Sequence, residues 1–183
     1  MTPIMRKPVQ DHKDRTGCVW EQPVYWVVLG QKFKGILSMA NKALSVAVQA
    51  GALRKKYDDG SVTEQTGDHL IWKWKHRPTP CSPKYTIKMK YKYKKHPDVY
   101  VLDPKPLPLA KGETRLPHVY NNEKQHICLY FRKGDDWSAD KLLSETVVPW
   151  IAEWLYFYEI WQYTGKWLGL WQQRLHLVMR EVQ

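Results

Sequence analysis

The residues best suited to covalent chemistry lie in one short segment in the last third of the chain. Cys128 stands within the run His126-Ile127-Cys128-Leu129-Tyr130-Phe131, directly after a long polar stretch. A cysteine thiolate is a strong nucleophile, and a neighbouring positive charge favours it over the thiol. Because His126 and Cys128 share a face in extended backbone, a protonated His126 imidazole would favour the thiolate. The alternative is a purely structural cysteine that packs as a small apolar side chain.

Polar side chains upstream of Cys128 are suited to stabilising a negatively charged carbonyl oxygen. His118 and the pair Asn121-Asn122 lie in the polar stretch before the cysteine. Imidazole and amide N–H groups are the kind of donor that forms an oxyanion hole. For His118 the alternative is a histidine that only orders the loop.

The sequence carries no pattern typical of a metal or nucleotide site. There are three cysteines, but no C-x-x-C pair, no P-loop and no G-x-G-x-x-G motif. We therefore predict neither a metal nor a cofactor. Cys18 and Cys81 have no neighbouring base and are interpreted as structural or incidental. An odd count of cysteines also makes a disulfide scaffold improbable and favours a reducing compartment.

Around these residues, the hydrophobic pattern predicts an α+β protein. Apolar residues recur at helical spacing from Gln31 to about Ala50, with Gly51 as the expected C-cap. Alternation predicts strands at His69–His76 and Tyr85–Tyr93, and a short third strand, Val99–Leu102, completes an antiparallel meander. Residues 103–126 are expected to form the loop that leads to Cys128.

The C-terminal third is expected to be helical. Apolar residues from Val147 onward share one face, with Thr146 as the expected N-cap and Thr164-Gly165 as the stop. Trp167–Val182 is a weaker second helical segment. The predicted organisation is an N-terminal extension, residues 1–30, which includes a short strand at Val24–Leu29, followed by one domain over residues 31–183.

The net charge of +11 is concentrated in one part of the chain. All of the surplus falls in residues 1–110, whereas residues 111–183 contain equal numbers of basic and acidic residues. Alternation places a row of lysines on one face of the Tyr85–Tyr93 strand, and we interpret this basic face as a docking surface for an acidic partner. Its members are Lys88, Lys90, Lys92 and Lys94.

The same lysines permit a rival interpretation, a basic nucleic-acid-binding domain in which bases stack on aromatic rings. Strict alternation argues against it, because Tyr85, Tyr91 and Tyr93 fall on the face opposite the lysines. The N-terminal segment is polar, and the most apolar stretch, residues 147–163, is interrupted by glutamates. We therefore expect a cytoplasmic protein without a membrane segment.

Several spaced motifs resemble the active-site region of ubiquitin-conjugating enzymes. In that family a His-Pro-Asn motif precedes a nucleophilic cysteine in an I-C-L segment, and a W-S dipeptide follows. Here the corresponding segments are Leu116-Pro117-His118-Val119-Tyr120, Ile127-Cys128-Leu129 and Trp137-Ser138. The likeness covers residues 31–165. The sequence resembles even more strongly the bacterial members of this fold from anti-phage CBASS operons. These share the P-H-x-Y loop, the C-L-Y segment and the spaced residues of Pro149–Gly165.

This resemblance implies a ubiquitin-conjugating (UBC-like) fold with an N-terminal helix, an antiparallel meander, a cysteine loop and C-terminal helices. It implies a cysteine-dependent acyl transferase, in which Cys128 forms a thioester with the C-terminus of a partner synthase and passes it to an amine. The implied partner is a cGAS/DncV-like nucleotidyltransferase, a cyclic-oligonucleotide synthase whose anti-phage signalling the conjugation would prime. A need for a separate activating enzyme is left open.

The resemblance also assigns supporting roles, with alternatives. His118 falls where the family keeps the asparagine of its motif, and Asn121 or Asn122 are the alternative donors. Asp136, with Asp135, is either an acidic group that orients the incoming lysine or part of a solvated turn. The third functional alternative keeps the fold and makes the protein a non-catalytic adaptor.

Overall fold

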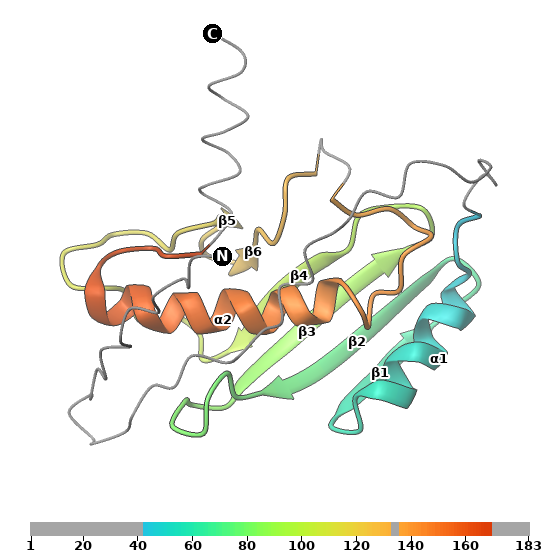
Figure 1. Cartoon of the computed structure of the whole chain (residues 1–183), viewed down its shortest axis with the longest axis horizontal. Helices are drawn as coiled ribbons and strands as arrows, with labels where there is room; N and C mark the ends of the chain where they lie inside the picture. The colour runs from blue at the N-terminus through green and yellow to red at the C-terminus, as the bar shows by residue number, and fades with distance from the viewer. Residues whose placement is uncertain (1–41, 133–135, 170–183) are drawn as a thin grey trace, which may run out of the picture. The chain divides into compact units, whose positions relative to one another are not determined.

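The computed structural model describes residues 42–132 and 136–169. Two helices, α1 (Val46–Lys56) and α2 (Val147–Thr164), cover one face of an antiparallel sheet (Figure 1). The sheet has six strands in the order β1-β2-β3-β4-β6-β5. Their bounds are β1 (Gly60–Gln65), β2 (His69–His76), β3 (Tyr85–Lys92), β4 (Asp98–Asp103), β5 (Val119–Asn121) and β6 (His126–Ile127). The mixed α+β class is as expected.

The central meander confirms the alternation in the sequence. In β2, Leu70, Trp72 and Trp74 are buried, and β3 buries every second residue from Tyr85 to Tyr91. The two strands pair in register over their whole length, with Trp72 opposite Met89. These side chains form the core beneath the helices, because burying one face of a sheet against a helix layer removes the most apolar area from water.

The first helix differs from the expected one. Ser45 accepts a hydrogen bond from the Val48 N–H at 3.3 Å, so α1 begins at Val46, and residues 42–45 are not helical. The helix runs through Gly51 to Lys56, so the prediction of Gly51 as C-cap is wrong. Its buried positions, Val46, Gln49, Ala50 and Leu53, continue at helical spacing past Gly51. Their packing outweighs the roughly 1 kcal/mol that a mid-helix glycine costs.

The second helix confirms its predicted bounds. Gly165 closes α2 with φ 69°, the left-handed conformation that glycine adopts without strain. Thr146 occupies the N-cap position, but its hydroxyl donates to the Leu142 carbonyl at 2.7 Å and does not cap the helix. Residues 167–169 are not helical, which contradicts the start of the predicted Trp167–Val182 segment. The rest of that segment and the whole predicted extension, residues 1–30, lie outside the described residues.

Strands β1, β5 and β6 were not predicted. Strands β5 and β6 are short. Strand β1 is an edge strand that buries few side chains, so its sequence is largely polar and shows no clear alternation. Gly60 begins β1 where a Cβ atom would lie 2.6 Å from the Trp72 ring, so a glycine is needed for this close approach. Within the described part of the chain, neither helix is long and apolar enough to cross a membrane.

A buried glutamine connects α1 to the segment that follows the cysteine loop. The Gln49 side chain donates to the Lys141 carbonyl at 2.9 Å and accepts from the Leu143 N–H at 2.8 Å. The bond to Leu143 is buried, and losing a partner there is costly. Gln49 therefore fixes the path of the chain between the cysteine loop and α2.

Candidate active site

Cys128 lies at the end of β6, with its side chain directed away from the core. Its neighbours Ile127 and Leu129 are almost fully buried, whereas Cys128 is half-buried, because successive side chains of extended backbone point to opposite faces. Its N–H donates to the His118 carbonyl at 2.8 Å, and its Sγ lies 3.7 Å from the Tyr130 carbonyl oxygen. Cys128 is a free thiol. Cys81, by contrast, is disulfide-bonded, which agrees with the structural role predicted for it, although the odd cysteine count had argued against disulfides.

The backbone of His118, and not its ring, is hydrogen-bonded to Cys128. Its carbonyl accepts from the Cys128 N–H and also from the Trp154 indole N–H at 3.2 Å. The imidazole packs against Trp167 with a ring-centroid separation of 4.8 Å. Burial lowers the pKa of His118, so the imidazole is neutral at pH 7. His118 also has a φ of 48°, which shapes the turn into β5.

The two predicted asparagines shape the loop through their side-chain carbonyls. Asn121 Oδ1 accepts from the Lys124 N–H at 2.7 Å, and Asn122 Oδ1 accepts from the Leu116 N–H at 2.8 Å. The loop is anchored further by the buried Gln125, whose amide donates to the Val101 carbonyl at 2.9 Å. These bonds hold the β5–β6 connection in one shape. The amide N–H groups of the asparagines remain candidate donors.

His126 lies on the same side of the sheet as Cys128, in an aromatic stack. Its ring lies 4.6 Å from the Tyr100 ring, and its Nε2 lies 3.1 Å from Asp98 Oδ1, at ion-pair distance but outside hydrogen-bond geometry. Burial, the leading cause, lowers the pKa of His126 despite the Asp98 carboxylate. The imidazole is therefore neutral at pH 7, and the positive charge expected beside Cys128 does not come from His126.

Two residues that we did not assign from the sequence complete the surroundings of Cys128. Tyr120, on β5, lies beside Cys128: its hydroxyl is 3.4 Å from the same Tyr130 carbonyl oxygen that Cys128 Sγ approaches. The Arg132 guanidinium lies over the Tyr120 ring, 4.6 Å from its centroid. Arg132 also donates to Asp98 Oδ1 at 2.7 Å. The P-H-x-Y motif already contained Tyr120, but no periodic signal indicated Arg132.

The acidic segment after the cysteine is only partly described. The Asp136 carbonyl accepts from Lys141 Nζ at 2.8 Å, and Trp137 is buried against Tyr91. Ser138 is hydrogen-bonded to Asp140. Asp135 lies outside the described residues.

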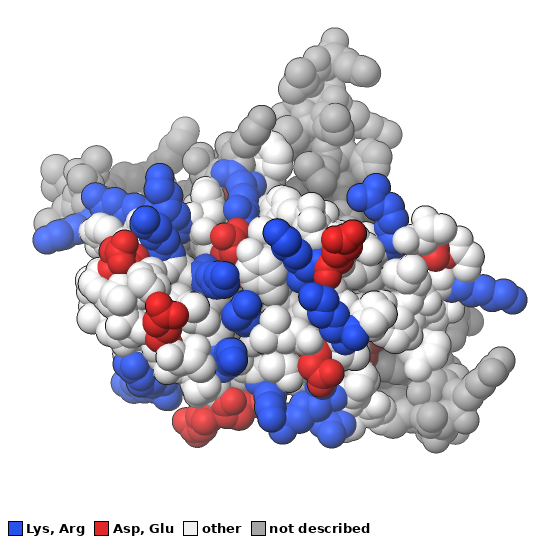
Figure 2. Space-filling view, turned by 180° about the vertical axis from the view of Figure 1, so that it is seen from behind, with Lys and Arg blue, Asp and Glu red and all other residues white. Residues whose placement is uncertain are grey.

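The basic face lies on the side of the sheet opposite the helices. Figure 2 shows Lys and Arg side chains over this side of the molecule, with Asp and Glu side chains among them. Lys88 lies directly opposite Lys73 on β2, and the Nζ atoms of Lys88 and Lys90 lie 5.5 and 5.8 Å from the Tyr100 ring centroid. Desolvation first, and then the charges of Lys90, Lys73 and Lys105, lower the pKa of Lys88.

The structure differs from the predicted basic face in two details. Lys94 lies beyond the end of β3, in the turn to β4 with φ 61°, and so does not belong to the strand face. Lys92, within β3, is exposed and lies 3.9 Å from Asp68. Tyr85 and Tyr91 are buried among the core residues, on the other side of the sheet from the lysines. The aromatic stacking that nucleic-acid binding would need is therefore not available from these tyrosines.

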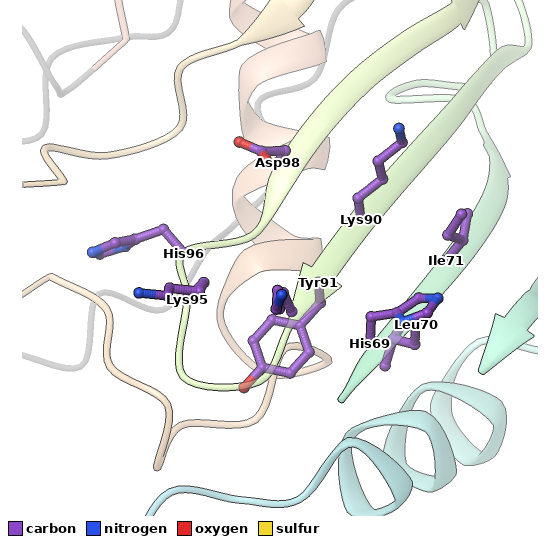
Figure 3. Close-up of a pocket in the computed structure, with 9 residues that line it drawn as sticks. His69, Leu70, Ile71, Lys90, Tyr91, Lys95, His96 and Asp98 are labelled. Carbon is purple, nitrogen blue, oxygen red and sulfur yellow. The ribbon is translucent and has the colours of Figure 1, made fainter. Parts of the chain in front are cut away.

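The basic face ends in a groove of about 460 Å³ beside the β3–β4 turn (Figure 3). Lys90, on β3, and Asp98, at the start of β4, both line it. Asp98 also binds Arg132, so one carboxylate is shared by the groove and the surroundings of Cys128. The remaining lining residues are His69, Leu70, Ile71, Tyr91, Lys92, Lys95 and His96.

Metal-site geometry and comparison with known proteins both bear on what this region can do. Within the described ranges, no group of three or more His, Cys, Asp or Glu side chains is placed to hold a metal ion. No curated protein matches the chain. The family model for the type II CBASS E2 protein matches residues 49–174, which is more than half of the chain and includes the cysteine loop, the sheet and α2. The chain therefore belongs to the type II CBASS E2 family, a group of E2-like proteins of CBASS antiviral defence.

Proposed function

We propose that the protein forms a thioester between Cys128 and the C-terminal carboxyl group of a partner cyclic-oligonucleotide synthase, and then transfers that acyl group to an amine. The observation that carries this proposal is a free, half-exposed thiol at the end of β6, inside the region that matches the E2 family. The CBASS family supports a cGAS/DncV-like nucleotidyltransferase as the partner. Its conjugation would prime anti-phage signalling in the cytoplasm.

The chemistry consists of two acyl transfers at one carbonyl carbon. The Cys128 thiolate attacks an activated C-terminal carbonyl, the C–S bond forms, and the activating group leaves with its electron pair. An amine then attacks the thioester, the C–N bond forms, the C–S bond breaks, and the amine proton passes to solvent. The activating group comes either from a separate enzyme or from the synthase itself.

We further propose that the basic face guides the acidic surface of the partner towards Cys128. Lys73, Lys88 and Lys90 lie on adjacent strands, and the mutual repulsion of their charges is relieved when an anionic surface docks. Tyr100 and His126 continue this side of the sheet from the lysines towards β6. The proposed docking surface and the nucleophile therefore lie on one continuous side of the sheet.

The test of the proposed function is to co-express the protein with the synthase encoded beside it and to measure the intact mass of the product. We expect a species whose mass equals the sum of the two chain masses less one water. Thiols or hydroxylamine should cleave it. Peptide mapping should find a Cys128 peptide that carries the C-terminus of the synthase. A synthase lacking its last residue is the matched control. Repeating the reaction with the two purified proteins, with and without lysate, tests the need for an activating enzyme. Absence of any thiol-labile adduct in both arms contradicts the proposal.

Charge reversal on the basic face tests the docking surface. We expect the double variant Lys88→Glu, Lys90→Glu to slow adduct formation by about 10- to 100-fold at low salt, because electrostatic steering is lost. The difference from wild type should shrink as salt is raised. The matched control is Lys55→Glu, Lys111→Glu, which reverses two charges at exposed sites outside β3. Equal rates of adduct formation for the two double variants would contradict docking on the basic face. Binding of RNA or DNA with a steep salt dependence would favour the nucleic-acid alternative.

A further inference from the structure

A β-bulge brings the side chain of Tyr120 to Cys128. In the β5–β6 pairing Val119 lies opposite Ile127 and Asn121 lies opposite His126, so Tyr120 is the extra residue between two consecutive partners. A bulge of this kind turns a side chain out of the regular alternation of its strand. The backbone bond from Cys128 to His118 extends the same pairing by one residue. Tyr120 and Cys128 are therefore held side by side by the backbone.

The phenol and the thiol meet at one acceptor. Tyr120 Oη lies 3.4 Å and Cys128 Sγ 3.7 Å from the Tyr130 carbonyl oxygen, so the two side chains share one hydrogen-bond acceptor. The Tyr120 ring lies 4.9 Å from the His126 ring, which limits its movement on one side. About half of Tyr120 remains exposed, so an acyl group on Cys128 can reach the phenol.

Arg132 lies over the ring of Tyr120. Its Nη2 donates to Asp98 Oδ1 at 2.7 Å and to the Pro97 carbonyl at 3.1 Å, which fixes the guanidinium over the Tyr120 ring. Burial works against the charge of Arg132, but the hydrogen bond to Asp98 and the neighbouring phenols raise its pKa above the ordinary value. The guanidinium is therefore a permanent positive charge within this cluster.

Tyr120 is a proton donor and not a base at neutral pH. Burial first, and then the hydrogen bond and charge of Cys128, raise the pKa of Tyr120 well above its ordinary value. A phenol that keeps its proton can donate a hydrogen bond to an anion throughout the working pH range. The imidazole of His118, by comparison, packs against Trp167.

We propose that Tyr120, held by Arg132 and Asp98, is the hydrogen-bond donor that stabilises the Cys128 thiolate and the oxyanion of the transfer step. This inference rests on the proposed function. When the amine attacks the thioester, the π electrons of the carbonyl move onto its oxygen, and the Tyr120 hydroxyl donates to that oxyanion. When the oxyanion collapses, the C–S bond breaks, and the electron pair returns to a thiolate that the same hydroxyl stabilises. Tyr120 is a catalytic residue, and Arg132 is a positioning residue.

The first test uses the full chain alone and follows alkylation of the Cys128 peptide by iodoacetamide as a function of pH. We expect Tyr120→Phe to lower the rate at pH 7 by about tenfold, which is the value of one hydrogen bond to a charged group, and to move the half-maximal rate to higher pH. The plateau at alkaline pH should be retained, because only the ionisation of the thiol changes and not its accessibility. Tyr163→Phe, the same change at a largely exposed tyrosine near the end of α2, is the matched control.

The second test measures transfer from the isolated thioester adduct to an added amine in a single turnover. We expect Tyr120→Phe to slow transfer by roughly 10- to 100-fold, as for loss of one oxyanion-hole donor. Arg132→Lys should slow it less, and the double variant should be no slower than Tyr120→Phe, because the two side chains act as one unit. If Tyr120→Phe matches wild type in both tests while His118→Gln is slow, His118 is the donor and this inference is wrong. A wild-type chain that forms no adduct at all instead contradicts the proposed function.

Discussion

Replacement of Cys128 by alanine is expected to abolish the thiol-labile adduct with the synthase completely. The structure holds no equivalent nucleophile nearby: within the described residues Cys128 is the free cysteine, and Cys81 is disulfide-bonded. Removing the nucleophile of a covalent mechanism leaves no path through the intermediate. The measurement is the intact mass of the co-expressed pair, followed by peptide mapping.

Cys128→Ser provides the matched variant for this experiment. A hydroxyl in the place of the thiol forms an oxyester, which is less reactive towards amines than a thioester, so we expect the adduct to persist in the presence of thiols. Both variants should fold normally, because the side chain is half-buried and outside the main core. An adduct of undiminished yield in Cys128→Ala would show that another residue is the nucleophile.

Truncation of Trp154 is expected to cause the largest loss of stability near the site. Trp154 is almost fully buried in α2, with its ring parallel to that of Tyr158 at a centroid separation of 5.5 Å. Its ring also lies 5.7 Å from that of Trp167. We expect Trp154→Ala to lower the free energy of unfolding by about 3–5 kcal/mol, the usual cost of removing a large core aromatic side chain. Denaturant unfolding measures this change.

A milder variant separates packing from the hydrogen bond to the cysteine loop. Trp154→Phe keeps an aromatic ring but loses the indole N–H that donates to the His118 carbonyl at 3.2 Å. We expect this variant to cost less than Trp154→Ala and to change the alkylation rate of Cys128, because the same carbonyl positions the Cys128 N–H. Leu168→Ala, at an exposed side chain, is the control and should change stability by less than about 0.5 kcal/mol. An alkylation rate in Trp154→Phe equal to that of wild type would contradict this link.

Strong periodicity made the central elements predictable. Strands β2 and β3 alternate so regularly that the buried face, with Trp72 and Tyr91, followed from residue order alone. The end of α2 followed from Gly165, because few residues adopt its left-handed conformation without cost. In contrast, the end of α1 was predicted wrongly, because Gly51 carries a local stop signal that the packing of Leu53 outweighs. The short strands β5 and β6 were missed because three and two residues are too few to show a period.

What the sequence by itself determined is the class of fold, the E2-like family and the segment that contains Cys128, because these depend on residue order and local spacing. What only the tertiary structure decided is which side chains meet that thiol. A β-bulge places Tyr120 beside Cys128. Arg132, which follows Cys128 in the sequence, lies over the Tyr120 ring, and its hydrogen bond to Asp98 holds it there. The His118 ring, a predicted candidate for the oxyanion donor, packs on Trp167. The physical reason is that a bulge and the packing of α2 set the directions of these side chains, and neither is a periodic property of the chain.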